Sequence, residues 1–286
     1  MRHSKTQTVF TLKSFADEHG HRMWHDRHLM NSLRMIKKVS TFSDFATRPI
    51  TDYKPTDIEE FVDSLQDEGL KDGTINRYLS AISSVFKEAV RKEVVTHAPS
   101  VRWKKESKGR PRYYTAKEVK DIIDFLKTSR DPWMADFVVI AVNTGMRLGE
   151  ILGINNPESK TVGRVSNCGS FVTLFDTKNG DERLVPLNKD AQWSLENLKG
   201  VPSAYYSHTR FYRTWWEAKD ELARHDDNFV FHVLRHTCAT RLAMEFNVET
   251  LTIGKILGHR STQTTQKYVH VQPDSIKKVM QKLENY

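Results

Sequence analysis

The chain has 286 residues, about the length of two domains that each contain their own core. A hydrophobic fraction of 38%, with 14 Phe, 9 Tyr and 6 Trp, indicates a folded protein, because disordered chains are poor in core-forming side chains. No run approaches the roughly 18 consecutive apolar residues of a membrane helix, and the start MRHSKTQTVF lacks the apolar run of a signal peptide. We therefore expect a cytoplasmic protein.

The chain is basic, with 44 Lys and Arg against 36 Asp and Glu, a net charge of +8 and an isoelectric point near 9.3. Residues 1–110 carry 20 basic and 15 acidic side chains and residues 111–286 carry 24 and 21, so both parts contribute to the excess. This balance favours a polyanionic partner, because each phosphate that a cation neutralises releases condensed counterions. Cys168 and Cys238 have neither a disulfide framework nor metal-ligand spacing, and we expect two reduced thiols.

The first third of the chain has the apolar spacing of helices. The predicted helices cover residues 10–16, 24–39, 56–69 and 74–92. The polar face of the last segment carries Arg77, Lys87, Arg91 and Lys92, which fits either a solvated exterior or a helix that faces a DNA groove. We predict a helical domain over residues 1–100 and name Arg77 as a candidate DNA-binding residue.

A basic segment follows at 101–112. It contains Gly109 and Pro111 as breakers of regular structure, one acid, Glu106, and the basic residues Arg102, Lys104, Lys105, Lys108, Arg110 and Arg112. This composition predicts an extended linker between two domains. The linker is either merely solvated or part of a clamp around a duplex. For the clamp, we name Lys104, Lys105, Arg110 and Arg112 as candidate DNA-binding residues.

The second domain, residues 113–286, begins with a capping box, Thr115 to Glu118, that predicts a helix, and a second helix follows Pro132. Three short β-type runs come next, at Thr161–Ser166, Ser170–Phe175 and Arg183–Pro186. The Asn-Gly pair between the last two is a strong hairpin signal, and helical patterns resume from residue 188. The sequence predicts a mainly α fold with a small antiparallel sheet.

Familiar nucleotide-binding and metal motifs are absent from the sequence, as is an acidic cluster for two metal ions. Five basic or hydroxyl-bearing residues are prominent instead. Arg147 follows a glycine break, His232 and Arg235 stand three apart on one helical face, and His259 follows a helix-ending glycine. Tyr268 lies in a short helical stretch beyond it. Singly, each residue also fits an ordinary role as a surface ion pair, a helix cap or a packing side chain.

In combination, these segments resemble the tyrosine recombinase (phage integrase) family. The matching motifs are TGMRLGE, HVLRHTCATRL and LGHRSTQTTQKYVHV, and Lys178 lies in the hairpin where the family keeps a lysine. The helix TINRYLSAISSVFKEAV is similar to the core-binding domain of the family. The resemblance implies a helical core-binding domain followed by a mixed α/β catalytic domain.

The resemblance also implies the chemistry of the site. Tyr268 would attack a DNA phosphate and form a 3′-phosphotyrosyl link, and His232 would accept its proton. Arg147, His232, Arg235 and His259 would hold the phosphate, and Lys178 would protonate the leaving 5′ oxygen. Two arginine forks stabilise a phosphorane-like state without a metal, so we expect no cofactor. We assign Glu150 to the support of Arg147 or to helix capping.

The expected partners are double-stranded DNA at attachment or core sites, other copies of the chain, and DNA-bending accessory factors. The tail, residues 273–286, carries Ile276, Val279, Met280 and Leu283 at helical spacing. This apolar face packs either on its own domain or on a neighbour, and the resemblance implies a homotetramer on DNA that exchanges this helix.

The function that we favour is integration and excision of a phage or mobile element. The chain begins almost directly with the core-binding domain, and its surface residues Trp24, His25, His28 and Trp103 are unlike those of a housekeeping resolvase. An Xer-like resolvase of chromosome or plasmid dimers is the main alternative. A type IB topoisomerase and a catalytically inactive DNA-binding protein are more remote, and a basic RNA-binding protein lacks its aromatic motif.

Overall fold

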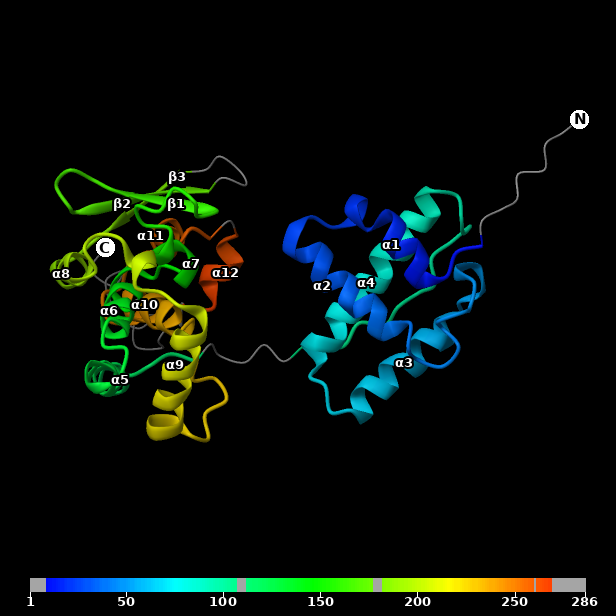
Figure 1. Ribbon diagram of the computed structural model, residues 1–286, viewed down its shortest axis with the longest axis horizontal. Helices are drawn as coiled ribbons and strands as arrows, with labels where there is room; N and C mark the ends of the chain where they lie inside the picture. Colours follow the sequence, from blue (N-terminus) through cyan, green and yellow to red (C-terminus); the bar gives the residue numbers. More distant parts are fainter. Residues whose placement is uncertain (1–8, 107–111, 177–181, 260, 269–286) are drawn as a thin grey trace, which may run out of the picture. The chain divides into compact units, whose positions relative to one another are not determined.

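The computed structural model describes residues 9–106, 112–176, 182–259 and 261–268. The chain folds as two compact units, Met1–Lys108 and Gly109–Tyr286 (Figure 1). Helices dominate both units, and the second also contains a three-stranded antiparallel sheet. The predicted fold class is therefore confirmed. No helix of the described ranges is long and apolar enough to cross a membrane.

The N-terminal unit is a helical bundle. Its helices are α1 (Leu12–Met23), α2 (Asp26–Val39), α3 (Pro55–Asp67) and α4 (Asp72–Arg91), with a 3-10 turn at Ile50–Asp52. The apolar stripes of the helices meet in one core, in which Phe15, Phe61 and Phe86 are fully buried. Arg77 and Lys87 are exposed on the polar face of α4.

The first part of the basic segment is attached to this bundle. The side-chain oxygen of Asn76 accepts from the N–H of Lys104 at 2.9 Å, and its amide nitrogen donates to the Lys104 carbonyl at 2.9 Å. The ammonium of Lys104 donates to Gln66 at 2.5 Å. Residues 101–106 therefore have no helix or strand but are bonded to α3 and α4 through Lys104, and Lys105 beside it is exposed.

The C-terminal unit contains eight helices and three strands within the described residues, besides a 3-10 turn at Pro202–Ala204. Its helices are α5 (Ala116–Thr128), α6 (Met134–Thr144), α7 (Leu148–Leu152), α8 (Lys189–Asn197), α9 (His208–Ala223), α10 (Val233–Met244), α11 (Thr250–Leu257) and α12 (Thr262–Gln266). The strands are β1 (Thr161–Val165), β2 (Phe171–Asp176) and β3 (Glu182–Pro186). The capping box that begins α5 is present as predicted, with Thr115 and Glu118 each bonded to the backbone of the other.

Helix α6 is the centre of this unit. It is apolar around most of its circumference, and Phe137, Val138 and Ala141 are fully buried between α5, α8 and α10. The helix ends at Gly145, whose φ of +66° is in the left-handed region. A Cβ on this residue would lie 2.3 Å from Cδ2 of Leu257, so glycine is required there. This turn carries the chain from the core to Arg147.

The sheet has the order β1-β2-β3, with Val172 of β2 opposite Val165 of β1 and Val185 of β3. Figure 1 shows it at one edge of the unit, next to α7 and α11. The hairpin residues 177–181, which join β2 to β3 and include Lys178, lie outside the described residues. Strand β3 packs on α11 and α7 packs on β1, so three separate parts of the sequence meet at this edge.

Candidate active site

Arg147 begins the site. It is the N-cap residue of α7, with an extended backbone, and both its backbone N–H and its Nη1 donate to the carboxylate of Glu150, at 2.8 and 2.7 Å. The Arg147 side chain is 47% exposed, so its guanidinium is bound to Glu150 and is still accessible to a ligand. The expected support of Arg147 by Glu150 has this geometric basis.

Arg235 is the buried cation of the site. It lies in the first turn of α10, it is 3% exposed, and its Nη1 donates to the carbonyl of Gly145 at 2.6 Å. Its Nη2 donates to the carbonyl of Leu257 at 2.5 Å, which ties α10 to the end of α11. Burial, together with the nearby Arg147, lowers the pKa of Arg235 to about 10, so the side chain keeps its charge at neutral pH.

Arg183 on β3 is a third cation, which the sequence alone did not single out. Its Nη2 donates to Oε2 of Glu150 at 2.9 Å, and its Nη1 donates to the same carbonyl of Leu257 that Arg235 uses. Gly258, with a φ of +68°, leaves room for it, because a Cβ there would lie 2.2 Å from Nη1 of Arg183. Arg183 therefore joins the sheet to α7 and α11.

Glu150 is the carboxylate that these three cations share. It is 9% exposed, and Nη1 of Arg235 lies 4.0 Å from its Oε2, in addition to the contacts of Arg147 and Arg183. Burial alone would raise the pKa of Glu150, but the charge of Arg183, the hydrogen bond from the backbone N–H of Arg147, and the charges of Arg147 and Arg235 outweigh burial and lower it. Three guanidinium groups against one ionised carboxylate leave a formal surplus of two positive charges.

Tyr268 lies against two histidine rings. Its Oη is 2.5 Å from Nδ1 of His236, and the centroid of its ring is 6.2 Å from that of His259 at an interplanar angle of 17°. Nδ1 of His259 is 2.8 Å from Oγ1 of Thr265, so Nε2 is the nitrogen that His259 offers to a ligand. His232, the exposed N-cap residue of α10, has its ring 5.0 Å from the ring of His236.

The electrostatics keep these groups neutral in the absence of a ligand. Burial, followed by the neighbouring His232, lowers the pKa of His236 to about 4, and burial with Arg235 lowers the pKa of His259 to about 4. Burial raises the pKa of Tyr268, although the arginines Arg147 and Arg235 act in the opposite direction. At neutral pH the site therefore holds neutral imidazoles and a protonated phenol beside permanent cations.

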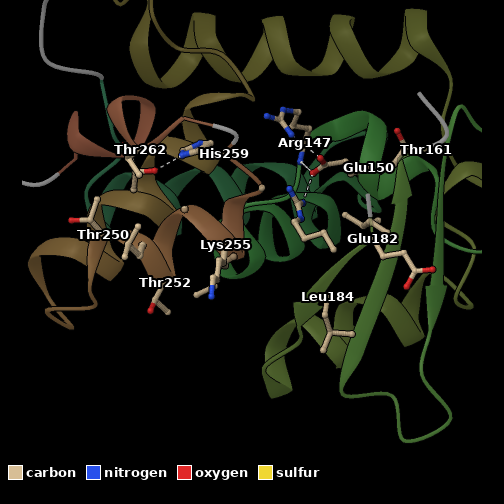
Figure 2. A pocket seen from close by; sticks show the side chains of 17 residues that line it. Arg147, Glu150, Thr161, Glu182, Leu184, Thr250, Thr252, Lys255, His259 and Thr262 are labelled. Atoms are coloured by element: carbon tan, nitrogen blue, oxygen red, sulfur yellow. Dashed lines mark hydrogen bonds and ion pairs between the residues drawn. The ribbon is translucent and has the colours of Figure 1, made fainter. Parts of the chain in front are cut away.

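A groove of about 710 Å³ opens over the arginine cluster. Figure 2 shows Arg147 and Glu150 on one side and His259 with Thr262 on the other. An anion that enters the groove meets the guanidinium groups of Arg147 and Arg183. A planar guanidinium binds phosphate oxygens in pairs. Within the described ranges, no group of three His, Cys, Asp or Glu side chains is placed to hold a metal ion.

The structure brings five of the six predicted catalytic residues together in one site, where they are linked by ring contacts and electrostatic interactions. They are Arg147, His232, Arg235, His259 and Tyr268. Lys178 lies outside the described residues. Tyr268 lies in a turn two residues after the end of α12, so the prediction that it lies within a helical stretch is wrong for this residue. Sequence reasoning missed His236 and Arg183, and the only local signal for His236 was its place next to Arg235.

The predicted DNA-binding residues differ in their surroundings. Arg77 and Lys105 are exposed, whereas Lys104 is bonded to Gln66, and Arg110 lies outside the described residues. Arg112 forms ion pairs with Glu118 and with Asp226, and its guanidinium lies 4.8 Å from the ring centre of Tyr114. Since both acids hold Arg112 in the C-terminal unit, its contacts are those of a packing residue at the start of α5.

Comparison with known proteins defines the class, an enzyme that breaks and rejoins DNA strands. Residues 112–275 match the phage integrase family, and residues 31–93 match the N-terminal SAM-like domain of phage integrases. The chain therefore belongs to the phage integrase family of tyrosine recombinases.

Relatives include both integrases and Xer recombinases. The integrase of Escherichia phage P2 is 25% identical over 94% of this chain and 73% of its own length. A tyrosine recombinase XerD of Chlorobaculum tepidum is 29% identical over 79% of each chain.

Solved structures share the fold. The Tn1549 transposon integrase in complex with a circular intermediate DNA has a TM-score of 0.73 at 17% identity, over 96% of this chain and all of that one. A lambda integrase tetramer bound to a Holliday junction has a TM-score of 0.74 at 21% identity, over 92% of this chain and 78% of that one. At these identities the likeness concerns the fold alone.

Proposed function

We propose that this chain is a site-specific recombinase that integrates and excises a phage or other mobile element through a 3′-phosphotyrosyl intermediate. The observation that carries the proposal is the position of Tyr268 beside a cluster of arginines with surplus positive charge. A phenol hydroxyl next to an anion-binding site is the arrangement that covalent attack on a phosphodiester requires.

The scissile phosphate binds in the groove beside Arg147. Arg147 offers its exposed guanidinium to the non-bridging oxygens. Arg235 adds a positive charge that is buried and preorganised, so solvent does not screen it. The exposed His232 and Nε2 of His259 donate to the same oxygens. These donors stabilise the pentavalent state more than the ground state, because its oxygens carry more negative charge.

Tyr268 is the nucleophile in this mechanism. An imidazole of the site accepts the phenol proton, the bond from Oη to phosphorus forms as the bond to the 5′ oxygen breaks, and Lys178 gives that oxygen its proton. A 5′-hydroxyl of a partner strand reverses the attack, so the reaction requires neither ATP nor a divalent ion. The structure gives the Tyr268 hydroxyl a hydrogen bond to His236, and not to His232 as the sequence led us to expect for the proton acceptor.

DNA is the macromolecular partner in this proposal. Arg77, Lys104, Lys105, Arg110 and Arg112 remain the candidates for backbone contacts, with the exposed Arg77 and Lys105 the best placed. Four copies assemble on two duplexes by exchange of the C-terminal helix, whose residues 273–286 lie outside the described ranges. DNA-bending accessory factors assist the assembly, which acts in the cytoplasm.

A resolvase of chromosome or plasmid dimers is the second candidate. The specific observation in its favour is the similarity to XerD proteins, which matches the similarity to the phage P2 integrase. The two candidates differ in the DNA that they cleave and not in the chemistry of the site. Sequencing of the cleaved ends separates them, because an integrase cuts an attachment site and a resolvase cuts a replicon resolution site.

Covalent trapping tests the proposed chemistry. Wild type and Tyr268→Phe are incubated in EDTA without ATP with DNA that contains bound sites, and the reaction is quenched with detergent. We expect a DNA-linked Tyr268 peptide by mass spectrometry from wild type only, with equal DNA binding by both proteins. An adduct on another residue would move the nucleophile, and no adduct from wild type would favour a DNA-binding protein without cleavage activity.

A further inference from the structure

His236 makes the hydrogen bond that fixes the hydroxyl of Tyr268. It lies in the first turns of α10, next to Arg235, whereas Tyr268 lies 32 residues further along the chain, after α12. Nδ1 of His236 and Oη of Tyr268 are 2.5 Å apart, and the two ring centroids are 5.6 Å apart. No assigned catalytic role accounts for this contact.

We infer that His236 is a positioning residue for the nucleophile, and that the Tyr268 hydroxyl donates its hydrogen bond to Nδ1 of a neutral imidazole. This inference rests on the proposed role of Tyr268. It adds to the site a residue that directs the attacking oxygen, separate from the side chains that hold the phosphate.

The direction of the hydrogen bond follows from acid and base strength. A phenol O–H is a much stronger donor than the N–H of a neutral imidazole, and an imidazole lone pair is a stronger acceptor than a phenol oxygen. Burial, followed by the charges of His232 and Arg235, disfavours a proton on His236, which keeps its ring neutral and Nδ1 open as an acceptor. When Tyr268 donates in this direction, the lone pairs of Oη stay available for phosphorus.

Two histidines then fix different features of Tyr268. His259 lies nearly parallel to the phenol ring, at an interplanar angle of 17°, and His236 holds the hydroxyl. The backbone N–H of Tyr268 donates to the carbonyl of Thr265 at 3.0 Å, which fixes the start of the side chain. A nucleophile held at three points loses little entropy when it attacks, and an error of about 1 Å costs on the order of 100-fold in rate.

The first experiment compares two variants of His236 with a control. His236→Phe keeps a ring of similar shape without an acceptor, and His236→Asn keeps an oxygen near the position of Nδ1. The exposed His225, outside the site, supplies the control His225→Phe. The rate of covalent adduct formation is measured in single turnover on a duplex that carries the mapped cleavage site, together with the affinity for that duplex and the thermal melt.

We expect His236→Phe to slow adduct formation by about 10- to 100-fold at unchanged affinity. His236→Asn should recover most of the rate, and His225→Phe should match wild type. Adduct formation by His236→Phe at the wild-type rate would overturn the inference and leave the proposed function intact. A wild type without any adduct would instead refute the proposed function, so the two failures are distinguishable.

A second measurement needs neither DNA nor activity. Nitrogen-15 spectra of the labelled histidines are recorded for wild type and Tyr268→Phe at pH 7.5, and the signals of His236 are assigned from the His236→Asn spectrum. We expect the tautomer with a proton on Nε2 and a hydrogen-bonded Nδ1 in wild type, and a changed Nδ1 shift in Tyr268→Phe. A proton on Nδ1, or identical spectra, would contradict the inference even where His236→Phe fails to fold.

Discussion

Two buried carboxylates in the C-terminal unit have opposite surroundings. Asp131, between α5 and α6, is fully buried and accepts hydrogen bonds from Thr214 at 2.7 Å, from Trp133 at 3.3 Å and from one cation, Arg210. Glu150 is also buried but contacts three cations. The first cluster is electrically balanced, and the second has a surplus of positive charge.

The difference separates a packing interaction from an anion site. A buried charge is costly unless it is paired and hydrogen-bonded, and the Asp131 cluster meets that condition by itself while it joins α9 to the start of α6. Around Glu150 the surplus cations repel one another until an anion enters. The arginine cluster therefore has the charge of an anion-binding site, and Arg147 and Arg183 line the groove through which an anion would enter.

The largest effect is expected from the cation that the anion site requires. Arg235→Ala removes the fixed charge and the bonds to Gly145 and Leu257, and should slow covalent cleavage by about 1,000-fold, since one lost oxyanion donor costs 100- to 1,000-fold. Arg210→Ala is the matched variant in the balanced cluster, where it should lower the thermal stability but leave the cleavage rate within about threefold. Rate constants for adduct formation measure both, and equal rate losses would erase the distinction between the clusters.

The second-largest effect is expected on stability when either buried carboxylate is neutralised. Glu150→Gln leaves three arginines without their counter-charge and should lower the free energy of unfolding by about 3 kcal/mol, as breaking a buried pair does. Sulfate should restore part of this loss, because it binds among the uncompensated cations. Asp131→Asn should lose comparable stability without any extra gain from sulfate. Thermal melts with sulfate or chloride at equal ionic strength measure the difference, and equal sulfate responses would contradict it.

A smaller effect is expected on DNA affinity, and it should differ between exposed and ion-paired cations among the predicted DNA-binding residues. Lys105→Ala should weaken DNA binding by less than tenfold and reduce the slope of log K against log salt by about 1, because one phosphate contact is lost. Arg112→Ala should mainly reduce stability, since its charge is bound to Glu118 and Asp226. Affinities at several salt concentrations test this, and a larger change of slope in Arg112→Ala would assign Arg112 to the DNA.

The smallest effect is on pH dependence. His236 and His259 have a pKa of about 4 in the folded protein and about 6.5 when unfolded, so the unfolded chain binds more protons between these values. Stability should therefore be fully present above about pH 6.5 and decline as the pH falls toward 4. We expect the melting temperature of wild type to fall by a few degrees from pH 7.5 to 5.5, and less in His259→Asn. A pH-independent difference between the two proteins would contradict these pKa values.

Much of the fold was predictable because its signals are local. The capping box at Thr115, the glycine turns at Gly145 and Gly258, and the alternating strands each depend on neighbours within a few residues. The positions of Arg147 and His259 next to these turns were predictable for the same reason. The predicted helical position of Tyr268 was wrong, because the residue lies in a turn after α12 and helix boundaries depend on packing as well as on propensity.

The sequence by itself determined which residues stand at the start or end of which helix, and through its motifs the family of the protein. Only the tertiary structure decided that His236 meets the hydroxyl of Tyr268, that Arg183 reaches across from β3, and that three arginines share Glu150. These contacts join segments separated by tens of residues. Their geometry is set by how the helices and the sheet pack around α6, and no local propensity encodes that packing.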